Sequence, residues 1–137
     1  MGQKEINLNE IYLNELNNKN NWQSLSIYYK LTEEIIEEFQ DKVDWNFIST
    51  YQKLSESFID KFKDNVDWSC ICQHQQLSES FIKQHLEYID WYYISAYQSL
   101  SESFIEKFQD KVNWNAIFRF QQISKELANK YFDKIEE

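Results

Sequence analysis

Two cysteines and two histidines are the residues best suited to chemistry in this sequence of 137 residues. Cys70 and His74 are four positions apart, so one face of a helix would present both side chains to a zinc ion. Cys72 would point elsewhere, and no Cys-x-x-Cys pair exists. Whether these side chains, with His85, bind metal depends on the elements that carry them.

The sequence repeats with a period of 23 residues. The hexapeptide LSESFI stands at 54–59, 77–82 and 100–105, and all five tryptophans keep the same spacing: Trp22, Trp45, Trp68, Trp91 and Trp114. Self-similarity at a fixed period of about 20 to 50 residues indicates stacked repeats. We therefore predict an N-terminal tail at 1–7 and an α-helical repeat domain at 8–137, composed of repeats 8–30, 31–53, 54–76, 77–99 and 100–122 and a partial C-terminal cap at 123–137.

Each repeat carries signals for two short helices. In the third repeat, Ser55 and Asp67 are good N-caps, and apolar residues follow each of them at helical spacing. The end of the first helix is less clear: Asn65 would suit a left-handed cap, but the equivalent residue is Lys in three other repeats. Helices this short are marginal alone and must stack. We expect an all-α protein, an α-solenoid of five to six stacked helix-turn-helix repeats in a single domain.

A leucine-rich-repeat horseshoe is the alternative fold at this period. It needs an L-x-x-L-x-L strand, which LSESFI and the apolar residue that follows it at helical spacing do not supply. The sequence also has one glycine and no proline, so it lacks most of the residues that punctuate strand-rich folds. The helical solenoid is therefore favoured.

The repeat assigns packing roles to the chemically capable residues. His74 takes the position of an aromatic residue in the other repeats, where it would continue the apolar side of the second helix, and His85 takes a phenylalanine position. Cys72 takes a serine position. The carboxylates recur as caps or solvent-facing pairs, and no glycine-rich phosphate loop is possible. We predict no metal, no cofactor and no catalytic residue, and hence no enzyme.

Binding specificity must then reside where the repeats differ. On the second helices, Phe47, Tyr92 and Tyr93 lie on the side away from the Trp and Ile positions, with Arg119 nearby. Tyr, Phe and Arg are enriched in protein-binding surfaces, so we predict a partner-binding role for these four residues. The alternative is that the rings pack between repeats or stand singly on the surface.

Negative charge is concentrated in repeats two to four. The net charge is −9, and residues 31–99 hold 13 acidic residues against 5 lysines. Such a face would attract a basic partner protein, for example by occupying a site on that partner that is built for nucleic-acid phosphates. The alternative is a solvated face that keeps the protein soluble. Direct binding of nucleic acid is disfavoured because no basic stripe is present. The candidate partner-binding acidic residues are Glu33, Glu34, Glu37, Glu38 and Asp41.

The stretches LSESFIDKFKDNVDW and LSESFIEKFQDKVNWNAI resemble short tandem repeats with a Leu-Ser-Glu opening and an Asp-Trp midpoint, which recur in proteins of giant DNA viruses, bacteria and phages. The resemblance covers residues 31–122 well and 8–30 loosely. It implies an interaction scaffold, often of viral origin, and carries no reaction with it.

These observations predict a non-enzymatic protein–protein interaction module with a protein partner. The alternative is an acidic stoichiometric inhibitor of a nucleic-acid-binding host defence enzyme, similar to an anti-CRISPR protein, whose partner is a basic protein. The opening MGQKEIN has no apolar signal sequence and no run is long enough to span a membrane, so we expect a cytoplasmic protein, monomeric or homodimeric.

Overall fold

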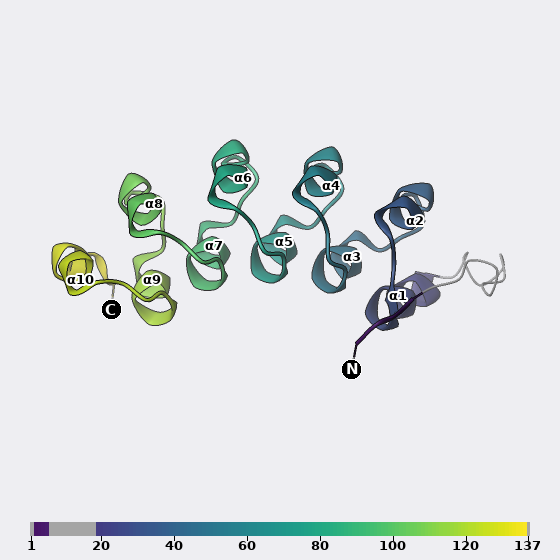
Figure 1. Cartoon of the computed structure of the whole chain (residues 1–137), viewed down its shortest axis with the longest axis horizontal. Coiled ribbons are helices and arrows are strands. Elements are labelled where there is room, and N and C mark those ends of the chain that lie inside the picture. Colours follow the sequence, from purple (N-terminus) through teal and green to yellow (C-terminus); the bar gives the residue numbers. More distant parts are fainter. Residues whose placement is uncertain (1, 6–18, 137) are drawn as a thin grey trace. The chain divides into compact units, whose positions relative to one another are not determined.

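A computed structural model describes residues 2–5 and 19–136. Residues 1, 6 and 7 of the predicted tail at 1–7, and residues 8–18 of repeat 8–30, lie outside the described residues. The chain divides into two compact units, unit 1 (residues 1–71) and unit 2 (residues 72–137), and the division falls within α5 (Trp68–His74). Each unit is a stack of short helices (Figure 1).

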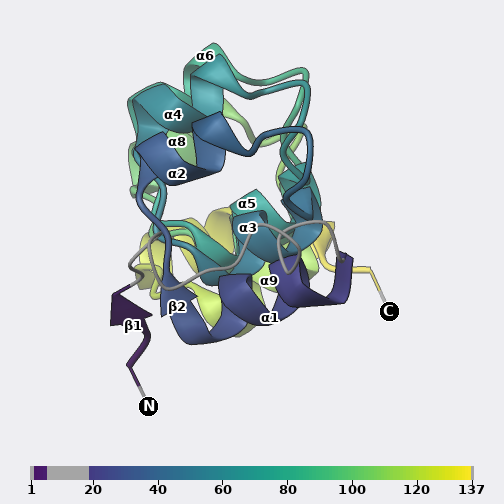
Figure 2. The same cartoon turned by 90° about the vertical axis from the view of Figure 1, so that its right-hand side faces the viewer.

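Unit 1 is built from alternating first and second helices of the repeats. The first helices are α2 (Glu33–Glu38) and α4 (Glu56–Lys61), and the second helices are α1 (Lys19–Tyr28), α3 (Trp45–Tyr51) and the start of α5. In both views, α2 and α4 form one layer and α1 and α3 the other (Figures 1 and 2). β1 (Lys4–Glu5) pairs in parallel with β2 (Tyr29–Lys30), which follows α1 directly.

Unit 2 continues the same alternation. Its first helices are α6 (Glu79–Gln84) and α8 (Glu102–Lys107), and its second helices are α7 (Trp91–Tyr97) and α9 (Trp114–Phe120). The partial repeat supplies α10 (Lys125–Tyr131) and the 3-10 helix η3 (Phe132–Lys134). The predicted all-α solenoid of 23-residue helical repeats is confirmed. Within the described residues, no helix has the length and apolar content that crossing a membrane requires.

The helices begin where the cap residues predict. The Ser55 and Ser101 side chains accept the backbone N–H groups of Phe58 and Phe104, and Asp90 accepts those of Tyr92 and Tyr93. The end of the first helix, which the sequence left open, is not a left-handed cap at Asn65, because no described residue has a positive φ. The helix ends at Lys61, its C-cap Phe62 has φ −107°, and the chain then passes into successive tight turns.

The core of each unit forms between consecutive repeats. The Trp45 ring packs on Phe62 of the next repeat, with ring centroids 5.2 Å apart, and in unit 2 the Trp114 ring stacks on Tyr131 at 4.4 Å. The indole N–H of Trp45 also donates to the carbonyl of Gln40, which satisfies a backbone oxygen beyond the end of α2. The 23-residue spacing of tryptophan therefore has a structural reason: the ring packs against the next repeat, and the indole N–H bonds the backbone of its own repeat.

In each unit, a buried glutamine fixes a connection between repeats. The Gln98 side chain accepts the backbone N–H of Leu77 at 2.9 Å and donates to the carbonyls of Cys72 and Gln75 at 2.8 and 2.7 Å. Gln52 makes the equivalent three bonds in unit 1. The side-chain amide thus supplies hydrogen bonds to backbone N–H and C=O groups between the short helices, which would otherwise lack partners.

Candidate protein-binding surface

The side chains with metal-binding potential do not converge. The thiol of Cys70 is half-buried and accepts a hydrogen bond from Asn46 Nδ2 at 3.3 Å. Cys72 is fully buried, and burial raises the pKa of its thiol to about 11. The His85 ring stacks on Phe81 with centroids 4.0 Å apart, in the core position that the repeat predicts. Among the described residues, no group of three or more His, Cys, Asp or Glu is placed to hold a metal ion.

Unit 2 carries a continuous row of aromatic side chains on its second helices. Tyr92 contacts Tyr93 at a centroid distance of 5.4 Å, Tyr93 contacts Tyr97 at 6.0 Å, and Tyr97 stacks on Phe120 at 6.4 Å with an interplanar angle of 17°. The guanidinium of Arg119 lies 5.2 Å from the centroid of the Phe120 ring. We call Tyr92, Tyr93, Tyr97 and Phe120 the aromatic ridge.

The local sequence explains the position of the ridge. Asp90 caps α7, so that Ile94 faces the core, whereas Tyr93 and Tyr97 are four residues apart and share another face of the helix. Phe120 ends α9 as Tyr97 ends α7, one repeat later. Each helix terminates at its aromatic residue, so the last ring projects beyond the packed turns. Tyr92, Tyr97 and Phe120 are 46%, 54% and 49% exposed.

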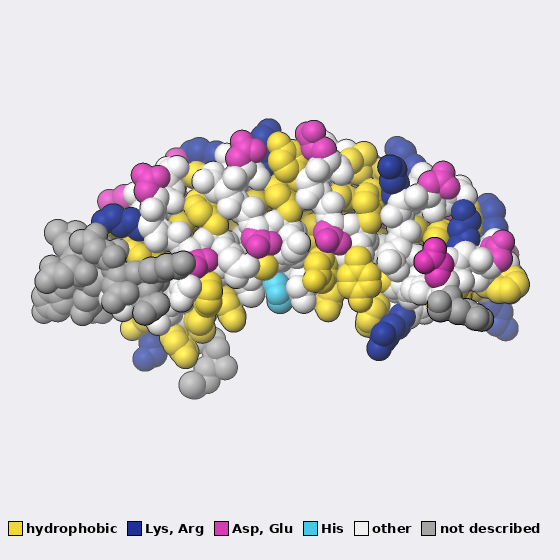
Figure 3. Space-filling model, turned by 180° about the vertical axis from the view of Figure 1, so that it is seen from behind, with side chains coloured by type: hydrophobic (Ala, Val, Ile, Leu, Met, Phe, Trp, Pro, Cys, Tyr) yellow, Lys and Arg dark blue, Asp and Glu magenta, His cyan; other side chains and the backbone are white. Residues whose placement is uncertain are grey.

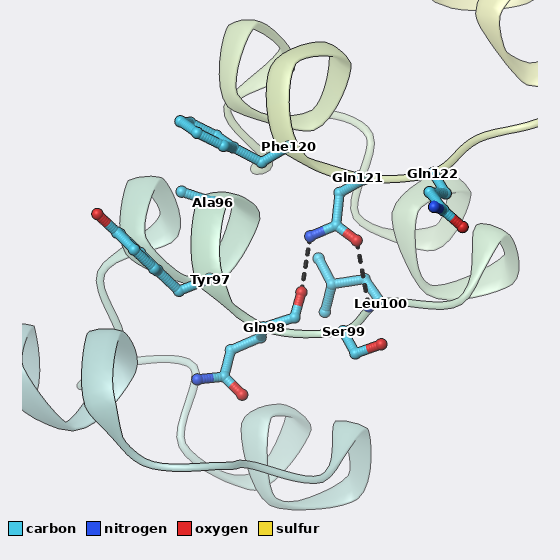
Figure 4. A pocket seen from close by; sticks show the side chains of 8 residues that line it. All are labelled: Ala96, Tyr97, Gln98, Ser99, Leu100, Phe120, Gln121 and Gln122. Atoms are coloured by element: carbon cyan, nitrogen blue, oxygen red, sulfur yellow. Dashed lines mark hydrogen bonds between the residues drawn. The ribbon is translucent and has the colours of Figure 1, made fainter.

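An open groove runs beside the ridge. It has a volume of about 490 Å³ and is lined by Ala96, Tyr97, Gln98, Ser99, Leu100, Phe120, Gln121 and Gln122. Figure 4 shows the Tyr97 and Phe120 rings projecting on the same side, with the Ala96 methyl between them. The Gln121 amide crosses behind them and bonds the Gln98 carbonyl at 2.6 Å. The equivalent residue of Ala96 is Ile, Thr, Gln or Arg in the other repeats, so the smallest side chain stands where the groove is open.

Unit 1 carries aromatic side chains at equivalent positions. Phe47 stacks on Tyr51 with centroids 5.7 Å apart, and the Tyr28 and Tyr51 rings are exposed. Phe47 itself is half-buried. The structure therefore groups Tyr92, Tyr93 and Arg119 in unit 2 and places Phe47 in unit 1; the binding role of each stays a prediction.

The five acidic candidates differ in their surroundings. Glu33 accepts the backbone N–H and the hydroxyl of Ser55, at 2.7 and 2.9 Å, and Glu37 forms an ion pair with Lys61. Both carboxylates therefore connect one repeat to the next. Glu34, Glu38 and Asp41 are exposed. A partner of the acidic face would meet these three without competing against contacts between repeats.

The sequence interpretation missed one aromatic position of the surface. The residue that ends each second helix was expected to continue the apolar, packed side, but Tyr28, Tyr51, His74, Tyr97 and Phe120 are all exposed. In Figure 3, hydrophobic side chains gather over α7 and α9 at this edge of unit 2. The available signal was the glutamine that follows this position in repeats two to five, because a buried amide there ends the helix.

Comparison of the chain with protein-family models, with curated proteins and with solved structures finds no significant match. The resemblance to the Leu-Ser-Glu/Asp-Trp tandem repeats therefore stays a prediction, and the function must be argued from the surface itself.

Proposed function

We propose that the protein is a non-enzymatic protein-binding module and that the aromatic ridge of unit 2 is its contact surface. The observation that carries the proposal is the exposure of three large rings, Tyr92, Tyr97 and Phe120, side by side on a helical scaffold. Large aromatic side chains gain more free energy from burial than smaller side chains do. A contiguous exposed apolar area is therefore typical of an interaction site.

The arrangement of the ridge favours tight contact. Each ring rests on the next, so few rotamers are left to freeze when a partner binds. Arg119 adds a fixed donor at one end, because its guanidinium already lies over the Phe120 ring. Tyr, Phe and Arg with restricted side chains are the usual composition of binding hot spots.

The proposal includes the remaining expectations from the sequence. The module acts in the cytoplasm as a scaffold or adaptor, and its partner is a protein. Chemistry is not part of the proposed role: Glu33 is engaged in a contact between repeats, Asp67 in a helix cap and Cys72 in the core.

The test is a binding experiment with ridge variants. The wild-type chain and a Tyr92→Ala/Tyr97→Ala variant are used to capture proteins from the lysate of the source cells, and each captured protein is then purified and titrated. We expect the variant to bind at least about tenfold more weakly, since a hot-spot ring contributes about 2 kcal/mol or more.

The matched control is Phe132→Ala. Phe132 is in the same unit and is 64% exposed, but it lies in η3 and has no place in the ridge. Its removal should leave the affinity unchanged. If every captured protein bound the ridge variant as tightly as the wild-type chain, the assignment of the surface would be wrong.

A further inference from the structure

The residues that line the groove of unit 2 have equivalents in unit 1, three repeats earlier. Ala96, Tyr97, Gln98 and Ser99 correspond to Ile27, Tyr28, Tyr29 and Lys30, while Phe120 and Gln121 correspond to Tyr51 and Gln52. The two sets of residues occupy the same repeat positions: the end of one second helix, the residues that follow it, and the end of the next second helix.

In unit 1, an extended segment of the chain itself occupies this position. β1 runs parallel to β2, with Lys4 opposite Tyr29 and Glu5 opposite Lys30. The preceding residue, Gln3, donates its side-chain amide to the carbonyls of Ser26, Ile27 and Tyr51, at 3.0, 3.2 and 3.1 Å. Residues 3–5 therefore contact backbone atoms near the end of α1, in β2 and at the end of α3.

The backbone frame that receives this segment recurs in unit 2. In unit 1, Gln52 Nε2 donates to the carbonyls of Ser26 and Tyr29 at 2.7 Å each. In unit 2, Gln121 Nε2 donates to the equivalent carbonyls of Ser95 and Gln98 at 2.9 and 2.6 Å. In both units the amide therefore joins the residues after one second helix to the end of the next, and in unit 2 Ser99 is exposed beside this connection.

Two differences favour an external segment at unit 2. Among the described residues, no segment pairs with Gln98 and Ser99, whereas β1 pairs with the equivalent residues of unit 1. The groove beside Tyr97 and Phe120 is also lined by Ala96, where unit 1 has the larger Ile27 at the same repeat position. Within the described part of the chain, the frame is therefore present in both units and is filled only in unit 1.

We propose that the groove of unit 2 binds an extended peptide segment of a partner protein, which adds as a parallel strand along Gln98 and Ser99 and places a glutamine side chain against the Ala96 and Phe120 carbonyls. This inference rests on the proposed function and names the class of its partner. Strand addition takes its affinity from backbone hydrogen bonds and its specificity from side-chain contacts. Tyr97 and Phe120, which line the groove, hold the repeat positions of Tyr28 and Tyr51 in unit 1.

The chain's own N-terminal segment is a poor occupant of the second groove. It already pairs with β2 in unit 1. A second copy of the chain would have to surrender that contact to bind elsewhere, so a foreign segment is the favoured ligand. The segment is nevertheless a ready probe, because it already fits the equivalent frame.

The experiment uses an acetylated peptide of sequence GQKEIN, corresponding to residues 2–7, titrated into the isotopically labelled full-length chain and followed by NMR. We expect saturable shifts of the Ala96, Gln98, Ser99 and Phe120 backbone signals. A GAKEIN peptide, which carries Gln3→Ala, should bind at least about tenfold more weakly, because it lacks the donor amide.

The blocking variant is Ala96→Arg. Arg119 and Gln73 occupy this repeat position in other repeats, so a long side chain is compatible with the helix but fills the groove. The control Thr50→Arg places the same side chain at the same repeat position of α3, outside unit 2. Binding at unit 2 should disappear in Ala96→Arg and persist in Thr50→Arg.

The outcomes separate this inference from the proposed function. Saturable shifts that Ala96→Arg removes would support it. An absence of shifts, shifts that persist in Ala96→Arg, or equal binding of the GAKEIN peptide would overturn it. In each of these cases the aromatic ridge would still be tested independently, by the loss of partner affinity in Tyr92→Ala/Tyr97→Ala.

Discussion

The Glu79 carboxylate accepts two hydrogen bonds from Ser101, one from its backbone N–H at 2.6 Å and one from its hydroxyl at 2.9 Å. Ser101 is the N-cap of α8, so the carboxylate of one repeat holds the cap of the next. Glu33 and Glu102 make the same connection to Ser55 and Ser124. The Leu-Ser-Glu motif is therefore a contact between repeats as well as a helix start.

Replacement of this carboxylate should loosen the stack. We expect Glu79→Ala to lower the free energy of unfolding by about 1 kcal/mol, since the bonds are charge-assisted but partly exposed to competing water. Urea denaturation followed by tryptophan fluorescence measures the change. Glu87→Ala removes an exposed carboxylate from the same repeat and should leave the midpoint unaltered. Equal midpoints for the two variants would contradict a connecting role.

The buried glutamine should have the larger effect. Gln98→Met keeps much of the side-chain volume but removes the partners of the Leu77 N–H and of the Cys72 and Gln75 carbonyls. Each buried polar group left unpaired costs about 1–3 kcal/mol, so we expect a loss of at least about 2 kcal/mol in the free energy of unfolding. Gln84→Met, at an exposed site at the end of α6, is the control. A loss no greater than that of Gln84→Met would show that water replaces the amide.

These two contacts show where the sequence sufficed and where it did not. The period and the Ser and Asp caps determine the number, spacing and starts of the helices, because those signals are local. The partner of Glu79 lies 22 residues away, so a carboxylate at a helix start is indistinguishable in sequence from a solvated one. The Gln98 amide similarly reaches residues up to 26 positions back, although its recurrence at the repeat period was visible.

Helical periodicity alone gave the wrong direction for Tyr97. Tyr97 is three residues after Ile94, a spacing that places both on one side of an ideal helix. Ile94 is buried and Tyr97 is exposed, because α7 ends at Tyr97 and the chain turns away through Gln98. Helical periodicity predicts which side chains are buried within a helix, but it does not predict the direction of the last side chain of so short a helix.

Cys72 should make stability depend on alkaline pH. Burial raises the pKa of this thiol from 9.0 to about 11. The folded state thus favours the neutral thiol. The contribution of this thiol to the free energy of unfolding is fully present below pH 9 and is lost as the pH rises through about 11. The loss amounts to up to about 3 kcal/mol. Cys72→Ser should abolish this component and keep the fold, since Ser49 and Ser95 occupy the same position and accept the backbone N–H groups of Asp67 and Asn113 at 3.0 Å.

The measurement for Cys72 compares urea midpoints of the wild-type chain and Cys72→Ser between pH 8 and 11. Lysine and tyrosine titration affects both proteins equally, so the difference reports the buried thiol. Parallel curves would show that the thiolate is not excluded from the core.

Asp67 should make stability depend on acidic pH. Burial acts to raise the pKa of this carboxyl group, but hydrogen bonds from the Cys70 and Ser69 backbone and the Asn46 side chain outweigh it, and the pKa lies below its ordinary value of 3.8. The contribution of the ionised Asp67 carboxylate to the free energy of unfolding is therefore present above pH 3.8. It is lost as the pH falls through the lower pKa of the folded state. Asp67→Asn should preserve the α5 cap, as Asn113 does for α9, and flatten this part of the acid transition. An acid transition identical to that of the wild-type chain would refute the assignment.

Reversal of the acidic residues on α2 should divide them into two classes. Glu34→Lys/Glu38→Lys changes exposed side chains, so we expect the urea midpoint to stay near the wild-type value. Glu33→Lys/Glu37→Lys removes the acceptor of Ser55 and places like charges beside Lys61, and we expect a clear loss of stability. Both pairs alter the net charge equally, which makes each the control of the other. If the two pairs had the same effect, the contacts between repeats would contribute nothing. If they differ as expected, a test of binding through the acidic face must use Glu34 and Glu38, because loss of binding in the other pair would report unfolding.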